Sequence, residues 1–350
     1  MPGWAEPPEP TPSQLEAWSA MQLKIANAVV EDKSLYEWNL DPASYDLPAV
    51  SSGNVSGRVP KMLVNGGGAA SQTDNKRKIT LLGGVDISFP KEGGTYSCAA
   101  LVVLRFPSLE VAYEDYAKVK LTVPYKAGYL SFREHPALVS MLRRLQKHAP
   151  ELVPDVVMVD GNGRLHPRRA GLACVLGVDT GIPHLGIAKN FLQVDGVTKL
   201  TVKASLKTAA SKSKEAGVVA PSSFPSSSPS SPSSSSSSSS PPPTTTLTTM
   251  VREGKKKEIF KGDPFCVPIV GKSGKVYGAA LRTGDTSRGM AFKPIYVSVG
   301  HNITLEDAVK LTRMASPMRV PAPVRAADLR SRELLRDPVA MENLREEPSE

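Results

Sequence analysis

Two short apolar runs in this chain each carry an aspartate, and this pairing limits the folds the chain can adopt. Residues 81–89 surround Asp86, and residues 156–159 lead directly into Asp160. Each run has the length and residue types of a buried β-strand. A carboxylate removed from water inside a strand is unfavourable unless a positive group pairs with it. The two runs therefore predict buried strands whose acids share a cation or face basic side chains.

A third carboxylate, Glu134, opens a segment with helical spacing. Leucines recur on one side of residues 138–145, which predicts a helix with an apolar face. Carboxylate oxygens brought together from separate elements suit hard divalent cations such as Mg²⁺, and metal ions of this kind can assist phosphodiester hydrolysis. The other interpretation of each acid is structural, as a residue that caps a turn. We expect Asp86, Glu134 and Asp160 to converge as metal ligands.

The order of the predicted elements is typical of an α/β domain. Strand-like runs at residues 79–89 and 96–106 precede the helix that contains Glu134, and the strand that ends at Asp160 follows it. A short helix and a further strand at residues 183–188 come next. Strands that alternate with helices in this way predict a mixed β-sheet flanked by helices.

Changes in composition predict the limits of this domain. Residues 46–77 are rich in Ser, Gly and Asn, and residues 204–257 include a Ser/Pro/Thr tract, so we expect a flexible loop and a long disordered insertion. A first helix should begin after Thr11, which forms a capping-box pattern with Gln14. The remaining expected units are an N-terminal helix that packs on the core (1–45), one catalytic domain (78–203 and 258–332) and a charged tail (333–350).

The net charge and the cysteines narrow the classes of function. A formal charge of +9 permits a polyanionic partner such as nucleic acid. Cys98, Cys174 and Cys266 are isolated and form no CxxC pair, so neither a zinc site nor a disulfide framework is expected. The sequence shows no secretory signal and no apolar stretch long enough to cross a bilayer. We expect a soluble, intracellular monomer in the cytoplasm or nucleus, including the nucleolus, with no membrane contact.

Six segments, taken in order, resemble the endonuclease V family. They are GGVDISF (83–89), PYKAGYLSFREHPAL (124–138), DGNGRLHPRRAGLACVLG (160–177), IPHLGIAKN (182–190), VSVGHNITLEDAVKL (297–311) and RVPAPVR (319–325). The resemblance implies a ribonuclease H-like fold and a Mg²⁺-dependent endonuclease, in which Mn²⁺ also works. It further implies that the enzyme cuts nucleic acid at the second phosphodiester bond 3′ to inosine and leaves 3′-hydroxyl and 5′-phosphate ends.

The resemblance also implies roles for single residues. The metal-binding catalytic carboxylates would be Asp86, Glu134 and Asp160. Lys189 would stand beside the reactive phosphate, where it could orient water or offset developing charge. His166 would contact the extruded base or assist at the metal, and His301 would support the site from a second layer. Asp285 is an additional candidate. Without the family, each of these residues could equally be structural.

A further set of residues would recognise the base. Pro124 and Tyr125 correspond to the wedge that fills the space left by an extruded base, although a tyrosine there could simply pack at a strand end. The pocket walls would be formed by Gly128, Leu130, Gly171 and Leu172. Backbone N–H groups in such a pocket would bind the six-position oxygen of inosine and leave the amine of adenosine unpaired, at a cost of about 1–3 kcal/mol.

Cleavage of inosine-containing single-stranded RNA is the preferred function, and three alternatives to it remain open. Segments such as FLQVDG (191–196) and the low-complexity insertion resemble eukaryotic members and favour RNA, but deoxyinosine in DNA, as in a DNA repair enzyme, is a close second. The chain could also bind inosine-containing nucleic acid without cutting it. A structure-specific nuclease that ignores inosine would use the same sheet chemistry.

Overall fold

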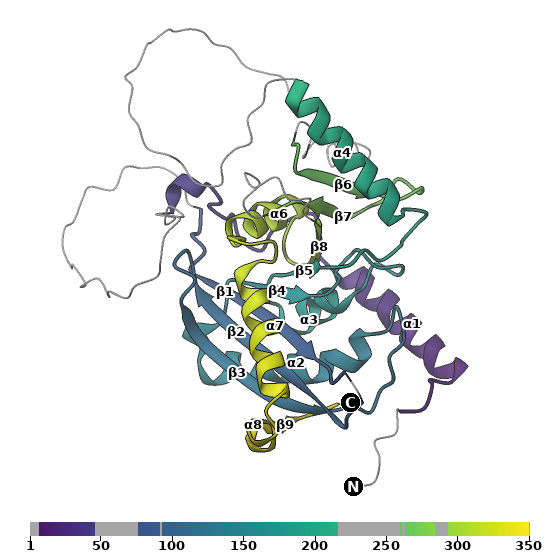
Figure 1. The fold of residues 1–350 in the computed structure, drawn as a ribbon, viewed down its shortest axis with the longest axis vertical. Helices are drawn as coiled ribbons and strands as arrows, with labels where there is room; N and C mark the ends of the chain where they lie inside the picture. Colours follow the sequence, from purple (N-terminus) through teal and green to yellow (C-terminus); the bar gives the residue numbers. More distant parts are fainter. Residues whose placement is uncertain are drawn as a thin grey trace, which may run out of the picture.

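One nine-stranded β-sheet with helices on both faces organises the structure, which is a computed structural model (Figure 1). The structure describes residues 7–45, 76–91, 93–215, 260, 263–283 and 293–349. Asp285 therefore lies outside the described residues, as do most of the expected loop at 46–77 and most of the insertion at 204–257.

The strands are β1 (Leu81–Ser88), β2 (Tyr96–Arg105), β3 (Val111–Lys120), β4 (Val156–Asp160), β5 (His184–Ala188), β6 (Cys266–Val270), β7 (Val276–Leu281), β8 (Ile295–His301) and β9 (Arg345–Glu347). Across the sheet their order is β6-β7-β8-β5-β4-β1-β2-β3-β9. β1 pairs antiparallel with β2 and parallel with β4, and β4 pairs parallel with β5. The central order β3-β2-β1-β4-β5 is that of the ribonuclease H-like sheet that the family resemblance implied, so the predicted fold class is confirmed.

The helices are α1 (Pro12–Ala28), α2 (Ser131–His148), α3 (Leu172–Thr180), α4 (Lys199–Glu215), α6 (Leu305–Met314), α7 (Ala322–Leu335) and α8 (Pro338–Asn343), with short 3-10 turns at Pro42–Ser44 and Pro150–Leu152. α2 and α3 cover one face of the central strands, and α7 crosses β1 and β2 on the other face (Figure 1). The predicted capping box at Thr11 and Gln14 is present at the start of α1.

The alternation of β1 residues between the two faces decides where Asp86 points. Val85 and Ile87 pack in the apolar core under α2, which includes Leu138. Successive strand residues face opposite sides of a sheet, so Asp86 and Ser88 face α7. Ser88 accordingly shares a hydrogen bond of 2.8 Å with Ser331 of α7. The acid of β1 thus lies beneath α7.

A glycine permits this close contact between α7 and the sheet. A Cβ added to Gly84 would lie 2.0 Å from the carbonyl oxygen of Pro323, so any other residue in the same place would collide with the first turn of α7. The first turn of α7 can therefore rest directly on β1 at Gly84, two residues before Asp86.

Parts of two segments that were expected to lie outside the catalytic domain are ordered in the structure, because their residues find apolar or hydrogen-bonding partners. The insertion was expected to begin at residue 204, but α4 continues to Glu215 and buries Val202 and Leu206 against the sheet. The expected tail contributes the end of α7, all of α8 and the strand β9, which pairs with β3.

Cys98, Cys174 and Cys266 are free and buried. No helix in the described part of the chain is long and apolar enough to cross a membrane.

Candidate active site

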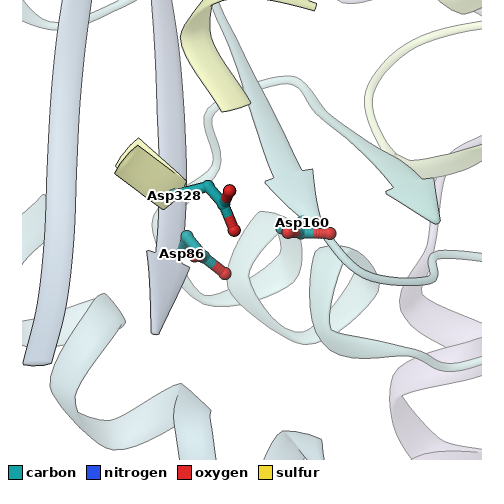
Figure 2. Close-up of side chains that lie close together, drawn as sticks. All are labelled: Asp86, Asp160 and Asp328. Carbon is teal, nitrogen blue, oxygen red and sulfur yellow. The ribbon is translucent and has the colours of Figure 1, made fainter. Parts of the chain in front are cut away.

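Three aspartates from three separate elements meet on the α7 face of the sheet (Figure 2). Asp86 comes from β1, Asp160 ends β4 and Asp328 comes from α7. One carboxylate oxygen of each lies within 4.8 Å of the other two. Asp86 and Asp160 stand at the same level because β1 and β4 run parallel, with Val85 paired to Val159. We call Asp86, Asp160 and Asp328 the aspartate cluster.

Two basic side chains partly balance the charge of the aspartate cluster. Lys189 follows β5, and its Nζ lies 2.5 Å from Asp160 Oδ2 and 2.9 Å from Asp328 Oδ1. Arg332, one turn after Asp328 in α7, lies 2.6 Å from the same Oδ1. Burial disfavours the charged lysine, but the nearby acids outweigh it and the pKa of Lys189 is raised. Lys189 is therefore a fixed positive charge beside the acids.

The environment of Asp86 and Asp160 disfavours their ionised forms, because the nearby basic groups do not fully offset burial and mutual repulsion. Burial, followed by the charge of Asp160, raises the pKa of Asp86 to about 7. Burial also raises the pKa of Asp160, against the opposing effect of Lys189. A divalent cation would relieve this repulsion, and oxygen ligands of this type suit Mg²⁺. The donor set therefore fits a metal-binding site.

Glu134 lies near the aspartate cluster but does not belong to it. It stands in the first turn of α2, on the opposite side of the sheet from α7. Burial, followed by the charges of Asp86 and Asp160, raises the pKa of Glu134 to about 8. Glu134 was predicted to join Asp86 and Asp160 as the third ligand. In the structure the third carboxylate beside these two is Asp328.

Sequence reasoning missed Asp328, although a signal was present. Val324, Ala327 and Ser331 form the buried stripe of α7. Asp328 follows Val324 by four residues and precedes Ser331 by three, so it belongs to the same stripe. An acid on the buried side of an amphipathic helix, just after the family-like segment 319–325, would have marked it as a candidate ligand.

His166 supports the predicted base loop and does not reach the aspartate cluster. Its Nε2 lies 3.0 Å from the carbonyl oxygen of Gly128, and its Nδ1 accepts a hydrogen bond from the Arg168 backbone N–H. Burial lowers the pKa of His166 to about 4, so the ring is neutral and donates through Nε2. His166 therefore fixes the backbone of the loop that carries Tyr125.

The supporting role expected for His301 is not seen, because His301 lies at the wrong end of the sheet. β8 runs antiparallel to β5, so His301 pairs with His184 while Tyr296 pairs with Ala188, next to Lys189. The His301 ring accepts a hydrogen bond from the Val30 backbone N–H. It therefore fixes the end of α1 at the edge opposite the acids.

Two neighbouring cavities lie at the acidic edge of the sheet. The larger, about 960 Å³, is lined by the aspartate cluster together with Lys189 and Arg332. The smaller, about 460 Å³, is lined by Tyr125, Leu130, Arg133 and Glu134, among others. Tyr125 is 61% exposed and stands at the mouth of this cavity, whereas Pro124 beside it is buried. Tyr125 is thus an exposed aromatic side chain on a loop whose backbone is fixed, and these are the properties that the predicted wedge requires.

The remaining predicted pocket residues are held by other contacts. Gly128 has a φ of +81° and accepts hydrogen bonds from Gln22 and Arg168. Gly171 packs so closely on the backbone of Asn162 that an added Cβ would lie 2.2 Å from its oxygen. Leu172 is buried in the core. None of Gly128, Gly171 and Leu172 lines either of the two cavities.

A ribonuclease H-like sheet that gathers aspartates beside a fixed lysine is the arrangement typical of metal-dependent nucleases. Comparison with known proteins specifies the kind: the sequence profile of endonuclease V matches residues 68–225 and 247–329, and the chain belongs to that family. Mouse endonuclease V is 37% identical over 330 residues, which span 94% of this chain and 71% of the mouse protein. Human endonuclease V is 36% identical over 94% of this chain and 85% of the human protein.

Solved structures agree with this assignment. The crystal structure of the catalytic domain of human endonuclease V superimposes with a TM-score of 0.64 at 33% identity, and the match covers 95% of this chain and all of that domain. The Ciona intestinalis enzyme, at 24% identity and a TM-score of 0.62, shares the fold, with 93% of this chain and 99% of that one covered. That structure holds a DNA that contains an inosine followed by a ribo-adenosine.

Proposed function

We propose that this nuclease uses Mg²⁺, or Mn²⁺ in its place, to hydrolyse the second phosphodiester bond 3′ to inosine in nucleic acid. Single-stranded RNA is the proposed substrate, and the products carry 3′-hydroxyl and 5′-phosphate ends. The observation that supports it most is the placement of the aspartate cluster beside a second cavity with an exposed tyrosine at its mouth. The monomeric state and the cytoplasmic or nuclear location stay predictions.

The carboxylates of Asp86, Asp160 and Asp328 would hold the cation, which supplies an activated water and neutralises charge on the phosphate oxygens. Asn162 lines the same cavity, and its buried Oδ1 has no hydrogen-bond partner among the described residues, so it can accept from a water there. Lys189 faces the reacting phosphate and offsets the negative charge that develops in the transition state. These residues position the phosphate and polarise the bond to be cut.

Glu134 is suited to move a proton. In the metal-free protein its pKa is raised to about 8 by burial and by the charges of Asp86 and Asp160, which brings it close to the range where general acid and base catalysts are most effective. It lines the smaller cavity, whose wall continues into the cavity of the aspartate cluster. We propose that Glu134 accepts a proton from the attacking water.

Base selection is assigned to the smaller cavity. A base taken out of the stack would enter it, while Tyr125 fills the space that the base leaves. Leu130 lines the cavity, and the backbone of the loop around Gly128 is held by His166 and Arg168. A fixed backbone can present its N–H groups to the six-position oxygen of inosine and discriminate against the adenosine amine.

Tyr125→Ala is expected to lower kcat/KM on a single-inosine strand by about 10-fold or more, because stacking on an aromatic ring is worth about 1–3 kcal/mol. The rate on a matched adenosine strand should stay at its low level. The substitution should leave the melting temperature unchanged, since the side chain is 61% exposed. An unchanged inosine preference would instead support a nuclease that reads the shape of its substrate.

The choice between RNA and DNA is tested by cleavage of matched single-inosine RNA and DNA strands of one sequence, with the product ends mapped. A ribose 2′-hydroxyl contact predicts faster cutting of the RNA. The nucleotide pair bound by the Ciona intestinalis enzyme, inosine followed by a ribo-adenosine, supports including a DNA strand with one ribose at that position. Equal rates on all three strands would contradict the RNA preference, and binding without cutting at any Mg²⁺ concentration would point to the non-catalytic alternative.

A further inference from the structure

The larger and the smaller cavity are separated by a shared wall. Both are lined by Phe89, Pro90, Lys91 and Gly93. This wall is the turn that follows β1, so it begins directly after the strand that carries Asp86. The position of the wall relative to the aspartate cluster is therefore set by the backbone of one strand. Any strand of nucleic acid that occupies both cavities must cross it.

Lys91 is the charged residue of this wall within the part of the chain that the structure describes. Its side chain is exposed, and no ion pair or hydrogen bond of its ammonium group to another described residue is seen. The basic side chains of the larger cavity differ from it in position, because Lys189, Arg332 and Arg336 do not line the smaller cavity. Lys189 and Arg332 are in addition already paired with acids.

We propose that Lys91 binds the phosphate group immediately 3′ of the inosine, the one that is not cut. This inference rests on the proposed function, in which the inosine base enters the smaller cavity and the scissile phosphate lies at the aspartate cluster. The second phosphodiester bond is the one hydrolysed, so one uncut phosphate remains between the base and the reacting group. That phosphate crosses the shared wall, where the exposed ammonium group of Lys91 attracts it.

This subsite explains why cutting occurs one nucleotide away from the recognised base. The wall separates base recognition from hydrolysis by a fixed distance, and a cation on the wall anchors the phosphate that spans it. Phe89 and Pro90 offer no hydrogen-bond donor from their side chains, so the position of the strand there depends on Lys91. Binding of this phosphate contributes affinity and sets which bond reaches the aspartate cluster.

The proposal is tested by removing each side of the contact separately and then both together. The protein change is Lys91→Gln, and the substrate change replaces the phosphate 3′ of inosine by an uncharged methylphosphonate. All strands carry a 2′-deoxy sugar at that linkage, so that a neighbouring hydroxyl does not cleave it. Each single change should lower kcat/KM by about 10-fold, because a charge-assisted hydrogen bond is lost. The two together should lower it by no more than either alone.

Two further readouts check the assignment. The slope of log kcat/KM against log salt concentration should become shallower by about 0.7 in Lys91→Gln, as expected for one phosphate contact on a single strand. Mapped products should show some cutting at the neighbouring bonds. Lys147→Gln, at the exposed end of α2, and a methylphosphonate placed 5′ of the inosine serve as controls and should change neither quantity.

The outcomes separate this inference from the proposed function. Wild-type protein that fails to cut inosine strands in Mg²⁺ or Mn²⁺ would overturn the proposed function and the subsite with it. Wild-type protein that cuts, combined with effects of Lys91→Gln and methylphosphonate that multiply to about 100-fold, would overturn the subsite alone. An unchanged rate in Lys91→Gln would do the same.

Discussion

Asp328→Asn is expected to lower kcat by about 10³-fold or more while the affinity for a single-inosine strand changes by less than about threefold. The substitution removes one of the charges that would hold the cation and leaves Lys189 and Arg332 in place. Asp160→Asn should behave in the same way, because both acids belong to the aspartate cluster. Single-turnover rates in Mg²⁺, together with binding measured in EDTA, distinguish loss of chemistry from loss of binding.

Glu333→Gln is a suitable control for this prediction, since Glu333 lies on the same helix with its side chain 69% exposed and pairs with Arg330. It should cut at the wild-type rate. If Asp328→Asn also keeps the wild-type rate while Glu134→Gln loses Mg²⁺ binding by calorimetry, then the ligand set predicted from the sequence is correct and Asp328 is not a metal ligand.

Glu134→Gln is expected to act in opposite directions on activity and on stability. The rate should fall by about 10²–10⁴-fold because the carboxylate that we propose as the proton acceptor is lost. The metal-free protein should become more stable at pH 8 and above, because the folded environment disfavours the Glu134 carboxylate. Its pKa is about 8 in the folded protein against an ordinary value of 4.5, so folding favours the protonated form.

The direction of the pH dependence follows from this difference. Between pH 4.5 and 8 the folded protein retains the Glu134 proton that the unfolded chain releases, so the free energy of unfolding falls as the pH rises. Thermal unfolding in EDTA should show the wild-type melting temperature falling across this range and the Glu134→Gln melting temperature falling less. Each 1 kcal/mol regained is worth roughly 2–4 °C.

A control variant for the stability measurement is Glu151→Gln, at an exposed position after α2, which should follow the wild-type curve. Added Mg²⁺ should raise the wild-type melting temperature most at high pH, where the acids are ionised. Identical curves for wild type and Glu134→Gln would show that this carboxylate is ionised at no cost to the fold.

The sequence was sufficient to predict the acids that lie on strands. Asp86 and Asp160 stand in or directly after short apolar runs, and parallel pairing brings such residues to one level of a sheet. Asp328 could not be placed in this way, because its position depends on how α7 packs. That packing depends on the contact between Gly84 and Pro323, two residues separated by most of the chain.

The other errors have the same origin in tertiary contacts. His301 was expected near the site, but the direction of β8 relative to β5 cannot be read from local spacing. The lysine-rich start of the insertion forms α4 because Val202 and Leu206 find a partner surface on the sheet. Local composition describes what a segment can do alone, whereas these segments are ordered by neighbours that are distant in sequence.

The short strand β9 has a consequence for the half of the molecule that carries Glu134. It pairs with residues 117–119 of β3 and so covers part of a strand whose backbone would otherwise be open to pairing with strands of other molecules. Arg144 of α2 links the helix to this edge of the sheet, because it forms ion pairs with Glu347 of β9 at 2.6 Å and with Asp115 of β3 at 2.7 Å. Loss of β9 is therefore expected both to favour self-association and to loosen α2, the helix that carries Glu134, from the side of the sheet remote from the aspartate cluster.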